Sequence, residues 1–187
     1  MTYDPNVHRR RSVRLKGFDY SSAGAYFVTI CTHERLCTLG AIEDCAVRLG
    51  PAGDTVHRIW ESLGDRFPGV ETDAVVVMPN HVHGILTLVG AQFIAPDIRH
   101  EGQRTPLLGE VVRAFKAAST RLIRTSGFEE FAWQRGYYEH VVRNETDLRR
   151  IREYIEANPM LWVHDPENPA VGPEKARDEL TGRLRAR

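Results

Sequence analysis

The hydrophobic positions of the chain follow two periods, which predict strands and helices in mixed order. Runs rich in apolar, β-branched and aromatic residues, bounded by glycine, proline or charged residues, are typical of strands. An extended conformation is also expected for an aromatic segment that precedes the last helical pattern. The predicted strands span residues 26–32, 36–39, 46–49, 72–78, 84–89 and 133–142.

Three other segments place apolar residues three and four positions apart, which predicts amphipathic helices. The first begins at Gly50-Pro51 and stops near Pro68-Gly69. The second covers residues 108–123 and ends at Gly127. The third begins after Asn144, whose short polar side chain is expected to cap it.

This order of strands and helices predicts an α+β protein with an antiparallel sheet covered by helices on one face. A chain of 187 residues is long enough for one domain with a real core and too short for two. We expect a basic arm at residues 1–19, one domain at residues 20–164, and a loose tail at residues 165–187.

The composition is ordinary for a globular protein, with 42% hydrophobic and 27% charged residues. No apolar run is long enough to span a bilayer, and the arginines near the N-terminus have no apolar stretch behind them, so neither a membrane protein nor a secreted one is expected. Cys31, Cys37 and Cys45 are odd in number and lack zinc-like spacing, which indicates reduced thiols in the cytoplasm.

The formal net charge of zero conceals a separation of charge along the chain. Residues 1–20 carry five basic and two acidic side chains, and residues 99–124 carry six and two. Residues 34–73 carry four basic and eight acidic side chains. Two basic clusters favour a nucleic acid as partner, and hence a nucleoid-associated protein, although a solvated surface is the commoner origin of any single cluster.

The strongest candidate for chemistry is the pair His81 and His83 in the sequence Met-Pro-Asn-His-Val-His-Gly at residues 78–84. Side chains alternate along a strand, so both imidazoles are expected on one face with Val82 on the other. Two neutral imidazoles that converge can hold a divalent metal. The corner before them and the missing side chain of Gly84 are expected to leave room for a substrate backbone. Ordinary hydrogen-bonded histidines are the alternative.

Tyr154 and Asn158 lie four positions apart in the last predicted helix, so they share a face. An amide oxygen is a suitable third ligand for a metal that prefers oxygen, and a phenol beside it is a candidate nucleophile. Tyr154 could equally be a packed aromatic of the apolar stripe, and Asn158 could be a helix stop before Pro159. Tyr137 and Tyr138 are rival nucleophiles, although stacking or packing suits them better.

A set of basic and aromatic residues is expected to bind DNA, because arginine and lysine contact phosphates and aromatic faces stack on bases. Trp133 and Tyr137 could instead belong to the core. The candidate DNA-binding residues are Arg9, Arg10, Arg11, Arg14, Lys16, Arg113, Lys116, Trp133, Gln134, Arg135, Tyr138 and His140.

Three ordered motifs carry a family resemblance. They are Met-Pro-Asn-His-Val-His-Gly at residues 78–84, Trp-Gln-Arg-Gly-Tyr-Tyr-Glu-His-Val-Val-Arg-Asn at residues 133–144, and Tyr-Ile-x-x-Asn-Pro-x-x-Trp at residues 154–162. Together with the run at residues 26–32, they resemble the REP-associated tyrosine transposases, which belong with the single-tyrosine HUH transposases. The resemblance covers about residues 20–162.

The resemblance implies a ferredoxin-like α+β fold and a metal-dependent transposase that cuts and rejoins single-stranded DNA at hairpin, repetitive palindromic sequences. It implies Mg²⁺ or Mn²⁺ held by His81, His83 and Asn158, and a 5′-phosphotyrosine intermediate on Tyr154. The third ligand is often glutamine in the wider group, which leaves the geometry at Asn158 open. Related transposases include dimers that exchange the tyrosine helix, so a monomer and a homodimer are both compatible.

Other functions compete with this one. A hairpin-binding protein of the same fold without transposition activity is the main alternative, and the intact histidines and tyrosine argue against it. A replication or conjugation nickase is disfavoured by the short single-domain chain. A metal-dependent hydrolase of small molecules is disfavoured by the basic arm and the aromatic segment.

Overall fold

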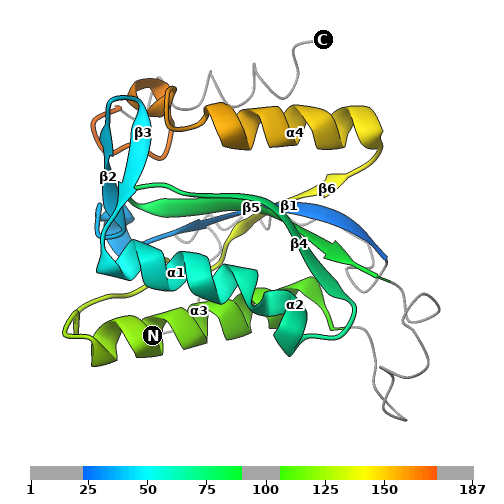
Figure 1. Cartoon of the computed structure of the whole chain (residues 1–187), viewed down its shortest axis with the longest axis horizontal. Coiled ribbons are helices and arrows are strands. Elements are labelled where there is room, and N and C mark those ends of the chain that lie inside the picture. Colours follow the sequence, from blue (N-terminus) through cyan, green and yellow to red (C-terminus); the bar gives the residue numbers. More distant parts are fainter. Residues whose placement is uncertain (1–22, 90–105, 172–187) are drawn as a thin grey trace, which may run out of the picture.

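The computed structural model describes residues 23–89 and 106–171, and its centre is a four-stranded antiparallel sheet (Figure 1). The strands lie in the order β4-β5-β1-β6, so β5 and β1 are central. Each neighbouring pair is antiparallel. The strands are β1 Gly24–Cys31, β4 Val70–Val77, β5 His81–Leu88 and β6 Tyr138–Val142.

Helices and a small hairpin complete the described residues. The hairpin joins β2 to β3 and is inserted between β1 and the first helix. The bounds of these elements are η1 His33–Arg35, β2 Gly40–Glu43, β3 Ala46–Leu49, α1 Pro51–Glu61, α2 Leu63–Arg66, α3 Leu108–Thr125, α4 Glu145–Ala157 and η3 Trp162–His164. The predicted cap of the last helix is confirmed, because Asn144 Oδ1 accepts a hydrogen bond from the Asp147 backbone N–H at 2.9 Å.

The α+β class with an antiparallel sheet is confirmed, and the connectivity is ferredoxin-like: β1, a helical segment, β4 and β5, then α3 and β6. The helices differ from the prediction in one respect. Helices α1 and α3 cover one face of the sheet, and α4 lies across the opposite face (Figure 1). A pattern of apolar positions shows that a helix is amphipathic, but not which face of a sheet it covers.

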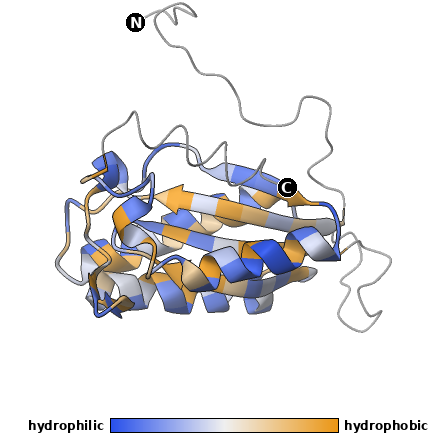
Figure 2. Cartoon of the chain, turned by 90° about the horizontal axis from the view of Figure 1, so that it is seen from above, coloured by the Kyte–Doolittle hydropathy of each residue, from blue (hydrophilic) through white to orange (hydrophobic). Residues whose placement is uncertain are grey.

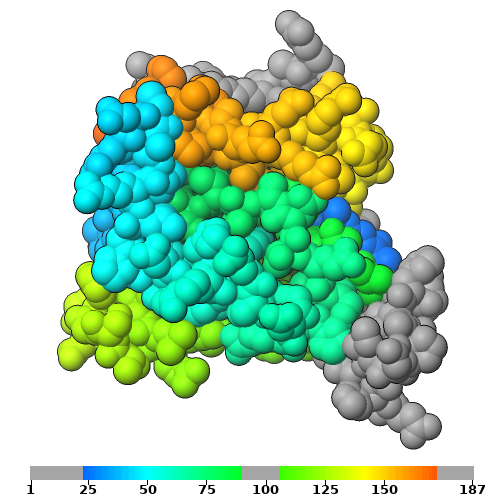
Figure 3. Space-filling model, viewed as in Figure 1, coloured from blue at the N-terminus to red at the C-terminus, as the bar shows by residue number. Residues whose placement is uncertain are grey.

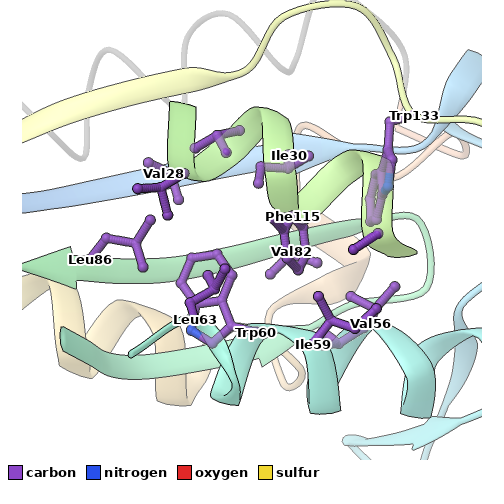
Figure 4. Packing of buried hydrophobic residues seen from close by; sticks show 14 of the residues in the cluster. Val28, Ile30, Val56, Ile59, Trp60, Leu63, Val82, Leu86, Phe115 and Trp133 are labelled. Atoms are coloured by element: carbon purple, nitrogen blue, oxygen red, sulfur yellow. The ribbon is translucent and has the colours of Figure 1, made fainter. Parts of the chain in front are cut away.

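The main core lies between the sheet and helices α1 and α3. Trp60 of α1 meets Phe115 of α3 edge to face, with ring centroids 5.4 Å apart. Figure 4 shows both rings beside side chains from the central strands, among them Val28 and Val82. Burial of this large apolar surface is the principal stabilising contribution to such a domain.

A smaller apolar cluster holds α4 on the other face. Ile151 and Ile155 of α4 pack against Phe27 of β1 and Ile85 of β5. In the space-filling view α4 and the segment after it lie across the top of the sheet (Figure 3). In the hydropathy view, hydrophobic stretches run along the strands beside helices of mixed character (Figure 2). The sheet is therefore buried on both faces.

Strand pairing places the two histidines on the α4 face. The antiparallel register sets Thr29 opposite His83 and Cys31 opposite His81. Val82 points to the other face and belongs to the main core, as the alternation predicted. Both histidines lie inside β5, which begins at His81, whereas the sequence predicted a strand starting at residue 84.

Two further sequence predictions are wrong. Residues 36–39 form no strand, since Leu39 instead bridges two other segments: its N–H donates to Pro79 O and its carbonyl accepts from Gly50 N, both at 2.9 Å. The expected loose tail does not start at residue 165. Residues 165–167 contact the end of the sheet and the segment after β1, and Asp165 is only 4% exposed.

Gly84 has a role different from the one expected. It lies in β5 on the α1 side of the sheet, where a Cβ would collide with the indole ring of Trp60. The missing side chain therefore makes room for the core tryptophan and not for a substrate. A substitution has to displace a buried ring in a close-packed interior.

We expect Gly84→Ala to lower the free energy of unfolding by about 1–3 kcal/mol, because the added methyl group overpacks the core. Urea denaturation followed by circular dichroism measures this change. Gly24→Ala in the neighbouring strand is the control, since its Cβ would meet nothing closer than Tyr26 Cε2 at 4.0 Å. Equal stability losses in the two variants would contradict the packing explanation.

Candidate active site

His81 and His83 meet beneath the C-terminal end of α4. Their ring centroids are 4.3 Å apart, and the two side chains are 0% and 3% exposed. Burial lowers the pKa of His83 to about 3 and that of His81 well below its ordinary value of 6.5. Both imidazoles are therefore neutral near pH 7, the form that binds a metal.

The side chain of Asn80 fixes the tautomer of His81. Its Nδ2 donates to the carbonyl oxygens of Arg35 at 3.0 Å and Glu167 at 2.7 Å. This leaves Asn80 Oδ1 facing His81 Nδ1 at 2.8 Å, so Nδ1 carries the proton and donates. His81 Nε2 then has an unshared electron pair, and it is buried without a hydrogen-bond partner. The sequence indicated Asn80 only as part of a corner.

Thr29 contacts the second imidazole. Its Oγ1 lies 2.8 Å from His83 Nδ1 across the β1–β5 pairing. A hydroxyl can donate or accept, so this contact orients the ring without fixing its tautomer; in the tautomer whose Nδ1–H donates to Thr29, Nε2 of His83 is an acceptor. The sequence analysis missed Thr29, because only the register of the sheet brings it beside His83.

Tyr154 projects from α4 toward His83, and Asn158 follows it four positions later at the end of the same helix. The Tyr154 hydroxyl lies 3.3 Å from His83 Nε2, and its ring packs edge to face on Phe27 with centroids 6.0 Å apart. Asn158 is the C-cap residue of α4 and is 1% exposed. Tyr154 is thus a packed aromatic that also contacts His83, and Asn158 does end the helix. Both roles had been left open as alternatives by the sequence.

Asp165 joins the group, although the sequence analysis had assigned it to the tail. Its Oδ2 lies 3.8 Å from His81 Nε2. Burial raises the pKa of Asp165 to about 6, against the lowering effect of hydrogen bonds from the Glu167 backbone and the Asn158 amide. No motif or spacing marks this aspartate, because it reaches the site through the turn that follows η3.

Three buried acceptor atoms of this region have no hydrogen-bond partner: His81 Nε2, Asn158 Oδ1 and Asp165 Oδ2. The first and the last lie 3.8 Å apart, and a lone pair and a carboxylate oxygen repel one another at this distance in a medium of low dielectric constant. A cation between them would relieve this repulsion.

The distances fit a metal. The ligand atoms of His81, His83 and Asp165 lie within 4.8 Å of one another, so this buried group could hold a metal ion. Opposite ligands of an octahedral Mg²⁺ ion are about 4.2 Å apart, so small side-chain shifts would close the site. Nitrogen and oxygen donors of this kind suit a divalent cation.

The structure does not support base stacking on Trp133. Its ring lies 5.7 Å from Phe115 and 5.2 Å from Phe131, and its Nε1 donates to Ser119 Oγ at 2.9 Å. The side chain is 8% exposed, so little of its face is open to a base. Trp133 therefore belongs to the core, the alternative that the sequence left open.

Lys116 also has a structural role. Its Nζ donates to the carbonyl oxygens of Gln134 at 2.6 Å and Gly136 at 2.8 Å, and its pKa is lowered by burial. It thereby holds the loop in which the side chains of Gln134 and Arg135 are exposed. Gly136 in this loop has φ +82°, a conformation that favours glycine.

The remaining candidates for DNA contact are dispersed. Arg113 is exposed on α3, on the face of the sheet opposite α4. Tyr138 is half-buried on the α4 face, and burial raises the pKa of its phenol. His140 Nε2 contacts Asp147 Oδ2 at 3.1 Å and links β6 to the start of α4. The arm residues (Arg9, Arg10, Arg11, Arg14 and Lys16) lie outside the described residues.

The sequence of the chain is similar to those of two known proteins. A Haemophilus influenzae protein described as uncharacterized is 38% identical over 172 residues, covering 87% of this chain and 95% of the relative. A second protein from that organism, named "Putative REP-associated tyrosine transposase", is 28% identical over 144 residues, covering 76% of this chain and 73% of the relative. The chain belongs to the family of REP-associated tyrosine transposases. The resemblance of its motifs to this family is thereby confirmed.

The fold agrees with this family. A solved structure of a REP-associated tyrosine transposase bound to a REP hairpin has a TM-score of 0.51 and 24% identity, covering 74% of this chain and 67% of that chain. At this identity the likeness concerns the fold. No family model matches the chain.

Within the described ranges, no helix has both the length and the apolar character needed to cross a bilayer.

An ion pair anchors α4 to an edge strand of the sheet. Strand β4 is irregular between Thr72 and Val75, and Asp73 within this bulge faces α4. Arg152 donates to both carboxylate oxygens of Asp73, from Nη2 at 2.6 Å and from Nε at 3.1 Å. Since Arg152 is two residues before Tyr154, the pair helps to fix the position of the hydroxyl.

We predict a pH-dependent stability loss in Asp73→Asn. Hydrogen bonds from Arg152 lower the pKa of Asp73 from 3.8, so ionised Asp73 stabilises the fold above that value and the contribution is lost as the pH falls. Urea midpoints should differ from the wild type at pH 7 and converge below about pH 4. Glu71→Gln on the same strand is the control, and a difference at pH 3 that is as large as at pH 7 would contradict the ion-pair explanation.

Proposed function

We propose that this protein cuts and rejoins single-stranded DNA, with Tyr154 as the nucleophile and a Mg²⁺ or Mn²⁺ ion held by His81, His83 and Asn158. Membership of a transposase family supports a DNA-processing enzyme. The observation that carries the finer proposal is the tyrosine hydroxyl 3.3 Å from His83 Nε2, beside buried nitrogen and oxygen acceptors that could hold a cation.

The arrangement suits attack on a phosphodiester, whose negative oxygens repel nucleophiles. When bound, a divalent cation would withdraw charge from a non-bridging phosphate oxygen. The Tyr154 oxygen bonds to phosphorus while the bond from phosphorus to the 3′-oxygen breaks. The phenol loses a proton as it attacks, and the departing 3′-oxygen gains a proton and becomes a hydroxyl. A 5′-phosphotyrosine results, and attack by another 3′-hydroxyl rejoins the strand without ATP.

The substrate we infer is a DNA hairpin with a single-stranded flank. A family relative was solved with a REP hairpin, which supports hairpin binding by this chain. The exposed Arg135 side chain and the basic arm are candidates for phosphate contacts. One chain supplies both histidines and Tyr154, so we propose that a single copy is catalytically complete.

Tyr154→Phe is expected to abolish the covalent adduct with DNA, because the change removes the attacking oxygen and little volume. Labelled hairpin DNA with a single-stranded flank is incubated with protein and Mn²⁺ and separated on a denaturing gel. The wild type should give a slowly migrating protein–DNA band, and the variant should give none.

Tyr138→Phe is the matched control, because this second tyrosine lies on the same face of the sheet and burial raises its pKa. It should retain the adduct. An adduct in Tyr154→Phe and none in Tyr138→Phe would assign the nucleophile to Tyr138. Hairpin binding without an adduct in the wild type would favour a DNA-binding protein without cleavage activity.

Replacing the five basic arm residues (Arg9, Arg10, Arg11, Arg14 and Lys16) with glutamine should weaken hairpin binding and its dependence on salt. Each lost phosphate contact lowers the slope of log K against log salt by about 0.7 to 0.9. Fluorescence anisotropy across a salt series measures both quantities. An unchanged affinity and slope would show that the arm makes no phosphate contact.

A further inference from the structure

We propose that Asp165 is an anionic ligand of the same metal ion, and that Arg35 and Asn80 position it. This inference rests on the metal site of the proposed function and adds a fourth side chain to it. Asp165 Oδ2 lies 3.8 Å from His81 Nε2, and both atoms are buried without a hydrogen-bond partner. A carboxylate supplies the negative charge that His81, His83 and Asn158 lack.

The turn after η3 directs one carboxylate oxygen into the site. Asp165 Oδ1 accepts a hydrogen bond from the Glu167 backbone N–H at 2.7 Å, and the Asp165 carbonyl accepts from Asn168 N at 3.0 Å. Asn168 Nδ2 donates to Trp162 O at 2.8 Å and closes the turn. Because Oδ1 is used within the turn, Oδ2 remains for the metal.

The end of the sheet holds this turn in place. Arg35 donates from Nη1 to Pro166 O at 3.0 Å, and its Nη2 lies 3.1 Å from Glu167 Oε2. Cys31 Sγ donates to the same oxygen, Glu167 Oε2, at 3.2 Å. Asn80 Nδ2 donates to Glu167 O at 2.7 Å. The amide that orients the His81 ring therefore also fixes the turn that carries Asp165.

If Asp165 served only to stabilise the turn, its replacement by asparagine would have a different effect from the loss of a metal ligand. As a turn residue, Asp165 needs only the Oδ1 acceptor, which asparagine retains at the same position. As a ligand, it needs the charge of Oδ2, which asparagine lacks. A buried carboxylate oxygen without a hydrogen-bond partner, as Oδ2 is, is also costly, so a turn alone gives no reason to retain the charge here.

The test measures metal binding directly, by calorimetric titration of the full-length protein with Mn²⁺ in the absence of DNA. Asp165→Asn should weaken Mn²⁺ binding by about tenfold or more, with a melting temperature in metal-free buffer that is no lower than that of the wild type. Asp54→Asn, which removes an exposed carboxylate of α1, should bind as the wild type does. Arg35→Met should weaken Mn²⁺ binding less than Asp165→Asn, since it acts only through the position of the turn.

His81→Ala separates the two proposals. Loss of Mn²⁺ binding in His81→Ala together with wild-type affinity in Asp165→Asn would overturn the role of Asp165 and leave the histidine site intact. Wild-type affinity in both variants would overturn the metal site itself. Weaker binding in Asp165→Asn and loss of binding in His81→Ala support the four-ligand site.

Discussion

The pairing of β1 with β5 at the centre of the sheet is the constraint on which the site depends. Its register sets Thr29 beside His83 and places both histidines on one face. A shift of one residue would turn the imidazoles into the main core and Val82 toward α4. Burial of Val82 among the α1 and α3 side chains therefore stabilises the register that the site requires.

One face of the sheet carries the large apolar core that stabilises the domain, and the other carries the candidate active site. On the α1 and α3 side, Trp60 and Phe115 fill a large apolar core, and Gly84 permits the close approach of the indole ring. On the α4 side the apolar cluster is smaller and surrounds polar groups, with Phe27 stacked on His83 at a centroid distance of 5.3 Å. The large apolar core on one face thus supports the face that carries the buried imidazoles.

Asn80 connects elements that are distant in sequence. One amide group contacts the η1 segment, the turn after η3 and the imidazole of His81. Its two donor hydrogens are both used on carbonyl oxygens, so its remaining oxygen selects the protonated nitrogen of the histidine. An exchange of Asn80 for a hydrophobic residue would remove all three restraints together.

The sequence by itself determined the elements and the local geometry of the site: the alternation that sets His81 and His83 together, the cap at Asn144, and the helical offset between Tyr154 and Asn158. These features depend on the period of a strand or a helix, which neighbouring residues specify. Only the tertiary structure decided which face α4 covers, that Trp133 is core, and that Asp165 and Thr29 border the histidines. The contacts around the histidines join residues separated by 54 positions (Thr29 and His83) or more, and they depend on sheet register and chain path, which no local pattern encodes.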